Sequence, residues 1–436
     1  MDSALGRASR ENLRVITSFT VENWKSVESA TLNIDPLTVL IGTNSSGKSN
    51  ILDALAFLSR VASGMMLTSA LQGDGLLTPL RGGVDWAARR PGKDFALGVV
   101  FRQNESTDLV YRIECHTDHN RCEVISEQLD RLKYRLGKDN GRKGMAGKIS
   151  LFRTDHVASD SPTIIARLYN GKSGTPRQLS RASAAVFQLM GQKTPLEVQD
   201  GIERIVGALR GTFILDPIPS HMRTFSPLSD RLDADAGNIA GVIAALPPAS
   251  KGQIETILTR YATRLPERDI ANVFAEAVGK FGSDAMLYSE EHLGTKGGRH
   301  IVDARGMSDG TLRFLAILTA LLTRPQNTLL VIEEVDNGLH PSRSQLLLEM
   351  LRDQGAARSV DVIVTTHNPA LLDAMGTRMV PFITVAHRDA ETGASRLTLL
   401  EDVEQLPKLL AQGPVGRMSS EGLIEEALSD QQAHEQ

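Results

Sequence analysis

The chain has 436 residues, of which 48 are basic and 52 acidic, so no overall positive charge marks it as a nucleic-acid binder. Aromatic residues make up 4%, which argues against a stacking platform for single strands, and two cysteines exclude a disulfide framework. The N-terminus lacks the apolar core of a signal peptide, and the longest strongly apolar run, Phe314 to Leu322, is too short to cross a bilayer. We therefore expect a soluble cytoplasmic protein without a membrane partner.

The first predicted elements are strands at 14–22, 31–34 and 37–41, the last an apolar run typical of a buried strand. The segment Gly42 to Ser49 follows and reads G-x-x-x-x-G-K-S, the phosphate-binding loop of nucleoside triphosphatases. Helical spacing of apolar residues continues over 50–58. A strand, a glycine-rich loop and a helix N-terminus together form an anion site, because backbone N–H groups wrap the phosphates and the helix dipole adds positive potential.

This loop supplies the predicted nucleotide site. We expect Lys48 to reach the β- and γ-phosphates of ATP and Ser49 to hold Mg²⁺. The full set of nucleotide-binding residues predicted here is Gly42, Thr43, Asn44, Ser45, Ser46, Gly47, Lys48, Ser49 and Asn50.

The next elements are strands at 95–102 and 109–116, which alternate like an antiparallel pair, and a third strand at 122–127. Four zinc-ligand side chains lie within Cys115 to Cys122, but their spacing matches no familiar zinc pattern, so an exposed turn is favoured over a metal site. The polar, basic stretch 131–148 is interpreted as a solvated loop, with contact to a nucleic-acid backbone as the alternative.

Helices are predicted over 180–210 and 252–281, the second interrupted near Pro266, with a short strand at 213–215 between them. An apolar helix at 314–322 follows the segment Met307 to Arg313. Ser308 is a good N-cap, and Gly310 allows close approach of an anion to the backbone. Capping alone is the simpler interpretation. Because one protomer has no use for two γ-phosphate sites, we predict that Ser308 and Gly310 serve the nucleotide of a neighbouring subunit.

Two further strands end in polar residues. The apolar run from Thr328 ends in Glu333 and Glu334, which places carboxylates at the carboxyl edge of a sheet beside the phosphate loop. We expect Glu333 to bind Mg²⁺ and Glu334 to accept a proton from the attacking water. The run 361–365 leads to His367, which is predicted to hydrogen-bond the γ-phosphate. The last residues, 428–436, are predicted to form a polar tail.

The order of these motifs resembles an ABC-type ATPase head of the SMC/RecF/OLD group, in a stand-alone form without a Toprim domain. Besides Walker A, the matching segments are Asn23 to Ser26, the Ser-Asp-Gly-Thr signature, the Glu-Glu Walker B, Gly338 to Pro341, and Thr366 to Pro369. The resemblance implies an α/β P-loop NTPase fold, with a mixed β-sheet flanked by helices and a mainly helical insertion. It implies three domains, at 1–150, 151–295 and 296–436.

The same resemblance implies a homodimer with two ATP molecules sandwiched between the Walker A of one head and the signature of the other. His340 then takes the place of the D-loop aspartate of transporter heads. Glu333, the pair Val335-Asp336 and Asn368 depart from the commoner residues of the family, so slow turnover is expected. Gln103 and Gln128 are both candidates for the Q-loop glutamine.

Spacing separates the branches of this group. From Lys48 to Ser308 is 260 positions, longer than in transporter heads, and sustained heptads are missing, unlike in SMC arms. The resemblance therefore predicts a dimeric ATPase switch, an ATPase subunit of a bacterial anti-phage defence system that controls a partner nuclease or toxin. A RecF-like DNA repair or DNA-binding ATPase and an ATP-binding scaffold with negligible turnover are the alternatives, and a transporter ATPase is disfavoured by the long insertion.

Overall fold

The computed structural model describes residues 15–75, 77–137, 141–157, 161–266, 270–292 and 297–434. The chain divides into two compact units. Unit 1 comprises the described residues within 1–34, 44–212 and 386–397, and unit 2 those within 35–43, 213–385 and 398–436. The predicted division at 150 and 295 stays a prediction.

Unit 2 is built on a parallel sheet with the strand order β10-β15-β16-β3-β17. Its strands are short and almost wholly apolar, as expected for strands covered on both faces. The bounds are β3 Leu37–Ile41, β10 Phe213–Leu215, β15 Thr328–Ile332, β16 Val360–Thr365 and β17 Ile383–Arg388, the last of which continues into unit 1. The strands predicted at 37–41, 328–333 and 361–365 are therefore confirmed, the second of them ending at Ile332, and the structure makes them neighbours in a parallel sheet.

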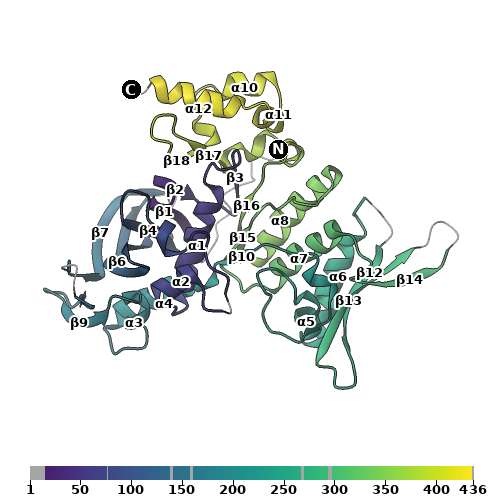
Figure 1. Cartoon of the computed structure of the whole chain (residues 1–436), viewed down its shortest axis with the longest axis horizontal. Helices are drawn as coiled ribbons and strands as arrows, with labels where there is room; N and C mark the ends of the chain where they lie inside the picture. Colours follow the sequence, from purple (N-terminus) through teal and green to yellow (C-terminus); the bar gives the residue numbers. More distant parts are fainter. Residues whose placement is uncertain are drawn as a thin grey trace. The chain divides into compact units, whose positions relative to one another are not determined.

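Helices cover this sheet, and α7 and α8 lie beside β15 and β16 (Figure 1). The whole of α7 from Gly310 to Leu322 is buried, so its apolar surface extends around the helix rather than along one face. The helices of unit 2 are α5 Ile239–Ala244, α6 Pro248–Ala262, α7 Asp309–Thr323, α8 Ser344–Arg358, α9 Pro369–Met375, α10 Leu406–Gln412, α11 Val415–Ser420 and α12 Leu423–His434, with the short 3-10 helices η2 His221–Arg223, η3 Pro341–Arg343, η4 Thr377–Phe382 and η5 Leu400–Asp402.

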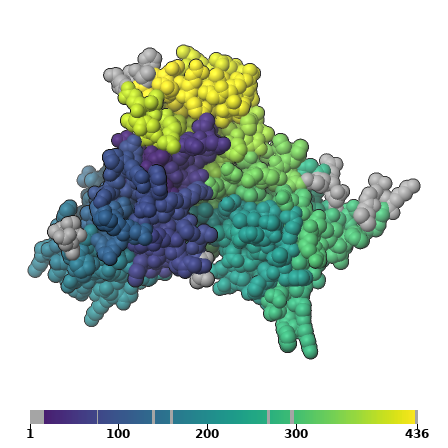
Figure 2. All heavy atoms as spheres, viewed as in Figure 1, coloured from purple at the N-terminus to yellow at the C-terminus, as the bar shows by residue number. Residues whose placement is uncertain are grey.

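A smaller antiparallel sheet completes unit 2, with the order β11-β13-β12 and β14 paired to β13. Its strands are β11 Ser226–Pro227, β12 Ile270–Val278, β13 Asp284–His292 and β14 Arg299–Asp303. The hairpin that joins β12 to β13 projects from the surface of this unit (Figure 2) and carries Phe281, which is 88% exposed.

Unit 1 contains a long antiparallel sheet in the order β2-β1-β4-β5-β6-β7-β8-β9, with β18 parallel to β2 through Ser395 and Val27. Trp24, Phe57 and Phe95 form an aromatic cluster between this sheet and α1. The bounds are β1 Val15–Trp24, β2 Val27–Asn33, α1 Lys48–Ala62, α2 Leu67–Gln72, η1 Val84–Trp86, β4 Asp94–Asn104, β5 Thr107–Asp118, β6 Arg121–Leu136, β7 Arg142–Thr154, β8 Thr163–Leu168, β9 Thr175–Ser180, α3 Ala185–Leu189, α4 Leu196–Gly211 and β18 Ser395–Leu399.

Three element predictions are corrected by the structure. The predicted helix over 252–281 ends at Ala262, and β12 begins at Ile270 because its residues pair with β13 along most of its length. The predicted loop at 131–148 is instead the end of β6 and the start of β7, paired to each other as a hairpin. The predicted tail is largely helix α12, in which Ile424, Ala427 and Leu428 are buried at helical spacing.

Candidate functional site

The phosphate-loop segment adopts backbone conformations that favour glycine at two positions. Gly42 has φ 139° and Gly47 has φ 108°, and Gly47 stands directly before α1. A side chain at Gly47 is excluded for a second reason, because an added Cβ atom would lie 2.4 Å from Ser395 Oγ. Lys48 and Ser49 form the first turn of α1, where the positive end of the helix dipole lies.

Several side chains of unit 1 hold this loop in place. Arg388 Nε donates to the carbonyl of Ser45 at 2.9 Å. Asn50 Nδ2 donates to Ser26 Oγ at 2.6 Å, and Ser26 Oγ lies 2.7 Å from Ser395 Oγ. The side chain of Asn50, predicted to bind nucleotide, is therefore engaged in supporting the loop. Arg388 was not identified from the sequence, since nothing in the motif points to a residue more than 300 positions away.

The turn between β1 and β2 is tied to the start of α1. Trp24 Nε1 donates to the carbonyl of Asn50 at 2.8 Å, and Lys25 Nζ forms an ion pair of 2.5 Å with Asp53. Both ends of this pair are nearly buried, so burial lowers the pKa of the Lys25 ammonium while the Asp53 carboxylate opposes that shift. This network joins the Asn-Trp-Lys-Ser segment to the helix that begins at Lys48.

The residues around the loop suit a phosphate group. Ser46 is 1% exposed, and among the described residues its hydroxyl has no hydrogen-bond partner. A buried hydroxyl without a partner is unusual in proteins, and a phosphate oxygen would satisfy it. Together with the bare backbone at Gly47, this donor fits a triphosphate held on the N-terminus of α1.

In unit 2, the carboxyl ends of three parallel strands bring predicted site residues to one edge. Gly42 and Thr43 follow β3, Glu333 and Glu334 follow β15, and His367 comes two residues after β16. The register pairs Ile332 with Val364, and Val364 with Val39, so the three strands end at nearly the same level. Ligands of open α/β sheets bind outside this edge.

Hydrogen bonds join the loop after β15 to the end of β16. The Glu334 N–H donates to Thr365 Oγ1 at 2.8 Å, and the Val335 N–H donates to the Thr365 carbonyl at 3.0 Å. Thr366 Oγ1 donates to Asp336 Oδ1 at 2.6 Å. These hydrogen bonds fix the segment of the Walker B glutamates to the strand that leads to His367.

Glu334 has a left-handed backbone with φ 47°, a conformation that costs free energy in a residue other than glycine. Its side chain is exposed, and Asn337 Nδ2 donates to Glu334 Oε2 at 3.3 Å. Such strain persists when the surroundings hold a residue in place, so the backbone of Glu334 is fixed by its neighbours.

The predicted signature lies at the start of α7. Ser308 caps the helix, since its Oγ accepts from the Thr311 N–H at 3.1 Å. An added Cβ atom at Gly310 would lie 2.4 Å from Arg343 Nη1 and 2.7 Å from the Gly338 carbonyl. Close packing within the chain therefore already requires a glycine at 310, independently of any anion.

Two arginines connect the start of α7 to the rest of unit 2. Arg223 Nη2 donates to the Met307 carbonyl at 2.8 Å and forms an ion pair of 2.7 Å with Asp309. Arg313, 5% exposed, donates to three backbone carbonyls, among them those of Glu333 and Glu334. The sequence contained no signal for most of these contacts, because their acceptors are backbone carbonyls, the carboxylate of Asp309 apart.

The remaining predicted residues have local contacts of their own. His340 caps η3 through its contact with Ser342, and the Asn368 side chain caps α9 by accepting from the Ala370 N–H. The Q-loop candidates Gln103 and Gln128 belong to β4 and β6 of unit 1.

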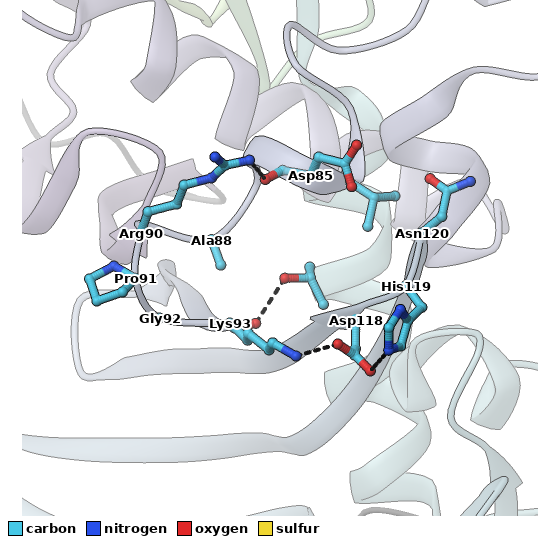
Figure 3. Close-up of a pocket in the computed structure, with 11 residues that line it drawn as sticks. Asp85, Ala88, Arg90, Pro91, Gly92, Lys93, Asp118, His119 and Asn120 are labelled. Carbon is cyan, nitrogen blue, oxygen red and sulfur yellow. Dashed lines mark hydrogen bonds and ion pairs between the residues drawn. The ribbon is translucent and has the colours of Figure 1, made fainter.

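The segment Cys115 to Cys122 comprises the end of β5, a two-residue turn at His119 and Asn120, and the start of β6, and its turn lies beside a cavity of about 280 Å³ (Figure 3). Figure 3 shows Asp118 between Lys93 and His119, with an ion pair to each. Both cysteines are buried, whereas the His119 side chain is 92% exposed. Within the described ranges, no group of three or more His, Cys, Asp or Glu side chains is arranged to hold a metal ion.

In the part of the chain that the structure describes, no helix is both long enough and apolar enough to cross a bilayer.

Two family models match the chain in separate segments. Residues 15–143 match a family described as "AAA ATPase domain". Residues 216–373 match a family described as "AAA domain, putative AbiEii toxin, Type IV TA system". The first segment contains Walker A, and the second contains the signature, Walker B and His367. No curated protein matches the sequence significantly.

Solved structures of SMC heads are similar to the chain. An SMC head bound to the C-winged helix domain of ScpA is 13% identical, with 88% of this chain and 97% of that chain covered and a TM-score of 0.49. The SMC head domain from Thermotoga maritima is 11% identical, with coverages of 88% and 98% and a TM-score of 0.42. An SMC head with an extended coiled coil, bound to the C-terminal domain of ScpA from Pyrococcus furiosus, is 13% identical, with coverages of 91% and 99% and a TM-score of 0.45.

Each matched segment belongs to a family described as an ATPase or AAA domain, and together the two segments contain every motif of the predicted site.

Proposed function

We propose that the protein binds ATP with Mg²⁺ and hydrolyses it slowly as a homodimeric switch in the cytoplasm. The observation that carries this proposal is the edge of the parallel sheet in unit 2, where two glutamates follow the strand β15 and the phosphate loop follows β3. Carboxylates at this edge are suited to a metal–triphosphate and to a water molecule attacking it.

In this proposal each residue has one task. Lys48 contacts the β- and γ-phosphates, and Ser49 and Glu333 hold Mg²⁺, which neutralises charge on the phosphate oxygens. Glu334 takes the proton of the attacking water, and its pinned backbone keeps the carboxylate in position. His367 donates a hydrogen bond to a γ-phosphate oxygen.

Dimerisation completes the site in this proposal. Ser308 and Gly310 of one protomer contact the γ-phosphate bound by the other, at the N-terminus of α7. ATP binding then closes the dimer, and hydrolysis opens it. The N-cap geometry of Ser308 supports the proposal, because the helix end is formed before any partner arrives.

The output is proposed to be control of a partner nuclease or toxin in a bacterial anti-phage system. The description of the family that matches 216–373 names a toxin of a type IV toxin–antitoxin system, which supports this context. The link is one of family membership, so the genes adjacent to this one are its first test. A toxin or nuclease gene there supports the defence role, and replication genes support a RecF-like repair factor.

One observation favours direct DNA contact as a second candidate function. The hairpin of β6 and β7 exposes Lys133, Arg135 and Lys143, and none of the three forms an ion pair with another described residue. Binding to a phosphate backbone would weaken steeply with salt. Alanine at all three positions should abolish retardation of duplex DNA and leave ATP turnover unchanged. Equal retardation by this variant would exclude the hairpin as the contact.

Glu334→Gln tests the catalytic assignment. The variant should bind ATP normally, lose turnover by about 100-fold or more because a general base is removed, and accumulate as a dimer. Steady-state ATPase assays and size-exclusion chromatography with ATP measure these effects. Glu404→Gln, at an exposed glutamate outside the site, is the matched control. Full activity of Glu334→Gln would refute the assignment, and absence of turnover in the natural protein would favour an ATP-binding scaffold.

Ser308→Arg tests the contact between subunits. The long cationic side chain should block closure of the dimer without preventing ATP binding to each head. Ser308→Ala serves as the comparison, since it loses the N-cap, which costs about 1 kcal/mol, but adds no bulk. Analytical ultracentrifugation with ATP in a Glu334→Gln background gives the dimer fraction. Unchanged dimerisation of Ser308→Arg would count against the contact in trans.

A further inference from the structure

Arg313 is a buried cation whose guanidinium is held mainly by backbone oxygens. Nη1 donates to the Pro217 carbonyl at 2.9 Å, and Nη2 donates to the carbonyls of Glu333 at 3.1 Å and Glu334 at 3.2 Å. The nearest carboxylate, that of Asp216, lies 3.4 Å from Nη2 on a side chain that is 62% exposed. Among the described residues, Arg313 Nε has no acceptor.

This environment is costly for a positive charge, because burial removes its water and only a largely exposed carboxylate opposes it. An apolar side chain would fill the same space without that cost. Unlike an apolar side chain, the forked guanidinium can donate at once to carbonyls that follow two different strands. The segment of Pro217 follows β10, and Glu333 and Glu334 follow β15.

The peptide that Arg313 holds is the one that sets the direction of the Glu334 side chain. Glu334 has φ 47°, and its carbonyl also accepts the Asn337 N–H at 2.9 Å. Its own N–H donates to Thr365 Oγ1 at 2.8 Å. Removal of the Arg313 contact would leave the carbonyl with one donor, so the strained conformation would be less well defined.

Arg313 contacts the Glu334 carbonyl, and the helix that carries Arg313 begins at the signature. Arg313 lies five residues after Ser308 on the rigid helix α7, a separation of little more than one helical turn. Arg223 fastens the residues on both sides of Ser308 to η2, in the segment that also supplies the Pro217 carbonyl. A displacement of the signature by a ligand would therefore reach the carbonyl of Glu334 through one helix and one side chain.

We propose that Arg313 is a positioning residue that couples the signature of a protomer to the general base Glu334 of that same protomer. In the dimer, the signature contacts the nucleotide of the partner, so Arg313 links the two ATP sites and makes their turnover cooperative. The inference rests on the proposed function, in which Glu334 is the base and the signature acts in trans.

Arg313→Lys tests the link, because the charge is kept but a compact ammonium group lacks the planar fork that reaches carbonyls on two strand ends at once. The full-length variant should lose kcat by about tenfold, with little change in KM for ATP. The Hill coefficient should fall to about 1 from a value in the natural protein that is clearly above 1 and at most about 2, the number of sites. Hydrogen exchange of the ligand-free protein should be faster by about tenfold in a peptide containing residues 333–337.

Arg324→Lys is the matched control, since Arg324 is a half-buried arginine that caps the other end of α7 and stacks on Phe213. It should leave the Hill coefficient and the exchange of 333–337 unchanged. A merely structural role for Arg313 would lower thermal stability and the active fraction but would not change the Hill coefficient.

Three other outcomes would contradict the coupling by Arg313. Natural protein with hyperbolic ATP dependence, or Arg313→Lys with undiminished cooperativity and unchanged exchange, would overturn the coupling while ATP hydrolysis stands. Natural protein with no turnover at all would overturn the proposed function together with this inference.

Discussion

Glu127 shows how strongly the interior of unit 1 acts on one side chain. It is 1% exposed and accepts hydrogen bonds from Tyr111 Oη at 3.0 Å and from the N–H groups of Ala185 at 2.5 Å and Val186 at 2.7 Å. Burial raises the pKa of its carboxyl to about 7, although these hydrogen bonds favour the ionised form. The residue ties β6 to the start of α3.

This pKa predicts a pH dependence of stability. Between pH 4.5 and about 7 the folded carboxyl keeps a proton that the unfolded chain has lost, so stability falls as pH rises through this window and then levels off. The loss amounts to about 3 kcal/mol. Glu127→Gln should lack this fall. Urea titrations give the free energy of unfolding of the natural protein and of the variant, and the difference between the two should change by that amount from pH 4.5 to about 7.

Glu105→Gln, in an exposed turn, is the control for this measurement and should follow the natural protein. A constant difference between the natural protein and Glu127→Gln from pH 4.5 to 8 would contradict the raised pKa.

Helix α4 contains two glycines with opposite surroundings. An added Cβ atom at Gly201 would lie 2.3 Å from Leu151 Cδ1, in the core between α4 and the sheet, whereas at Gly207 nothing lies within 4 Å. Gly201 therefore allows the helix to approach β7 closely. Gly207 is exposed and only makes the helix less favourable than alanine would.

The two alanine substitutions in α4 should change the free energy of unfolding in opposite directions. Gly207→Ala should stabilise by about 1 kcal/mol through helix propensity. Gly201→Ala should destabilise by about 1–3 kcal/mol, because the buried Leu151 must move in a filled core. Free energies of unfolding in urea check both. Stabilisation by both variants would mean that the core at Leu151 is looser than the structure shows.

For the protein as a whole, binding of ATP should raise the free energy of unfolding. ATP with Mg²⁺ at about 100 times its Kd should stabilise the folded chain by about 2.7 kcal/mol, since only the folded state forms the site. Thermal unfolding with and without nucleotide measures this effect. Lys48→Ala should remove the stabilisation, whereas Ser308→Arg should keep it, because the binding of each head does not need the partner. Equal stabilisation of Lys48→Ala would exclude the phosphate loop as the site.

Several elements were predictable because their signals are local. The strand at 37–41 and the helix after Lys48 follow from apolar spacing around a glycine-rich loop. The hairpin of β6 and β7 was missed because its stability comes from pairing with neighbouring strands, while its own residues are largely charged. Strand β12 was missed because its three alanines and its glutamate also suit a helix, and pairing with β13 settled the choice.

The phosphate loop, the Walker B glutamates and the Ser308 cap could be recognised in the chain before any fold was known, because each depends on residues a few positions apart. The arginine contacts that support the site could not be recognised in this way. Arg313 meets Pro217 across 96 positions and Glu334 across 21, and Arg388 meets Ser45 across 343. Their acceptors are backbone carbonyls, which every residue possesses, so no side-chain pattern marks them and folding alone selects which ones are used.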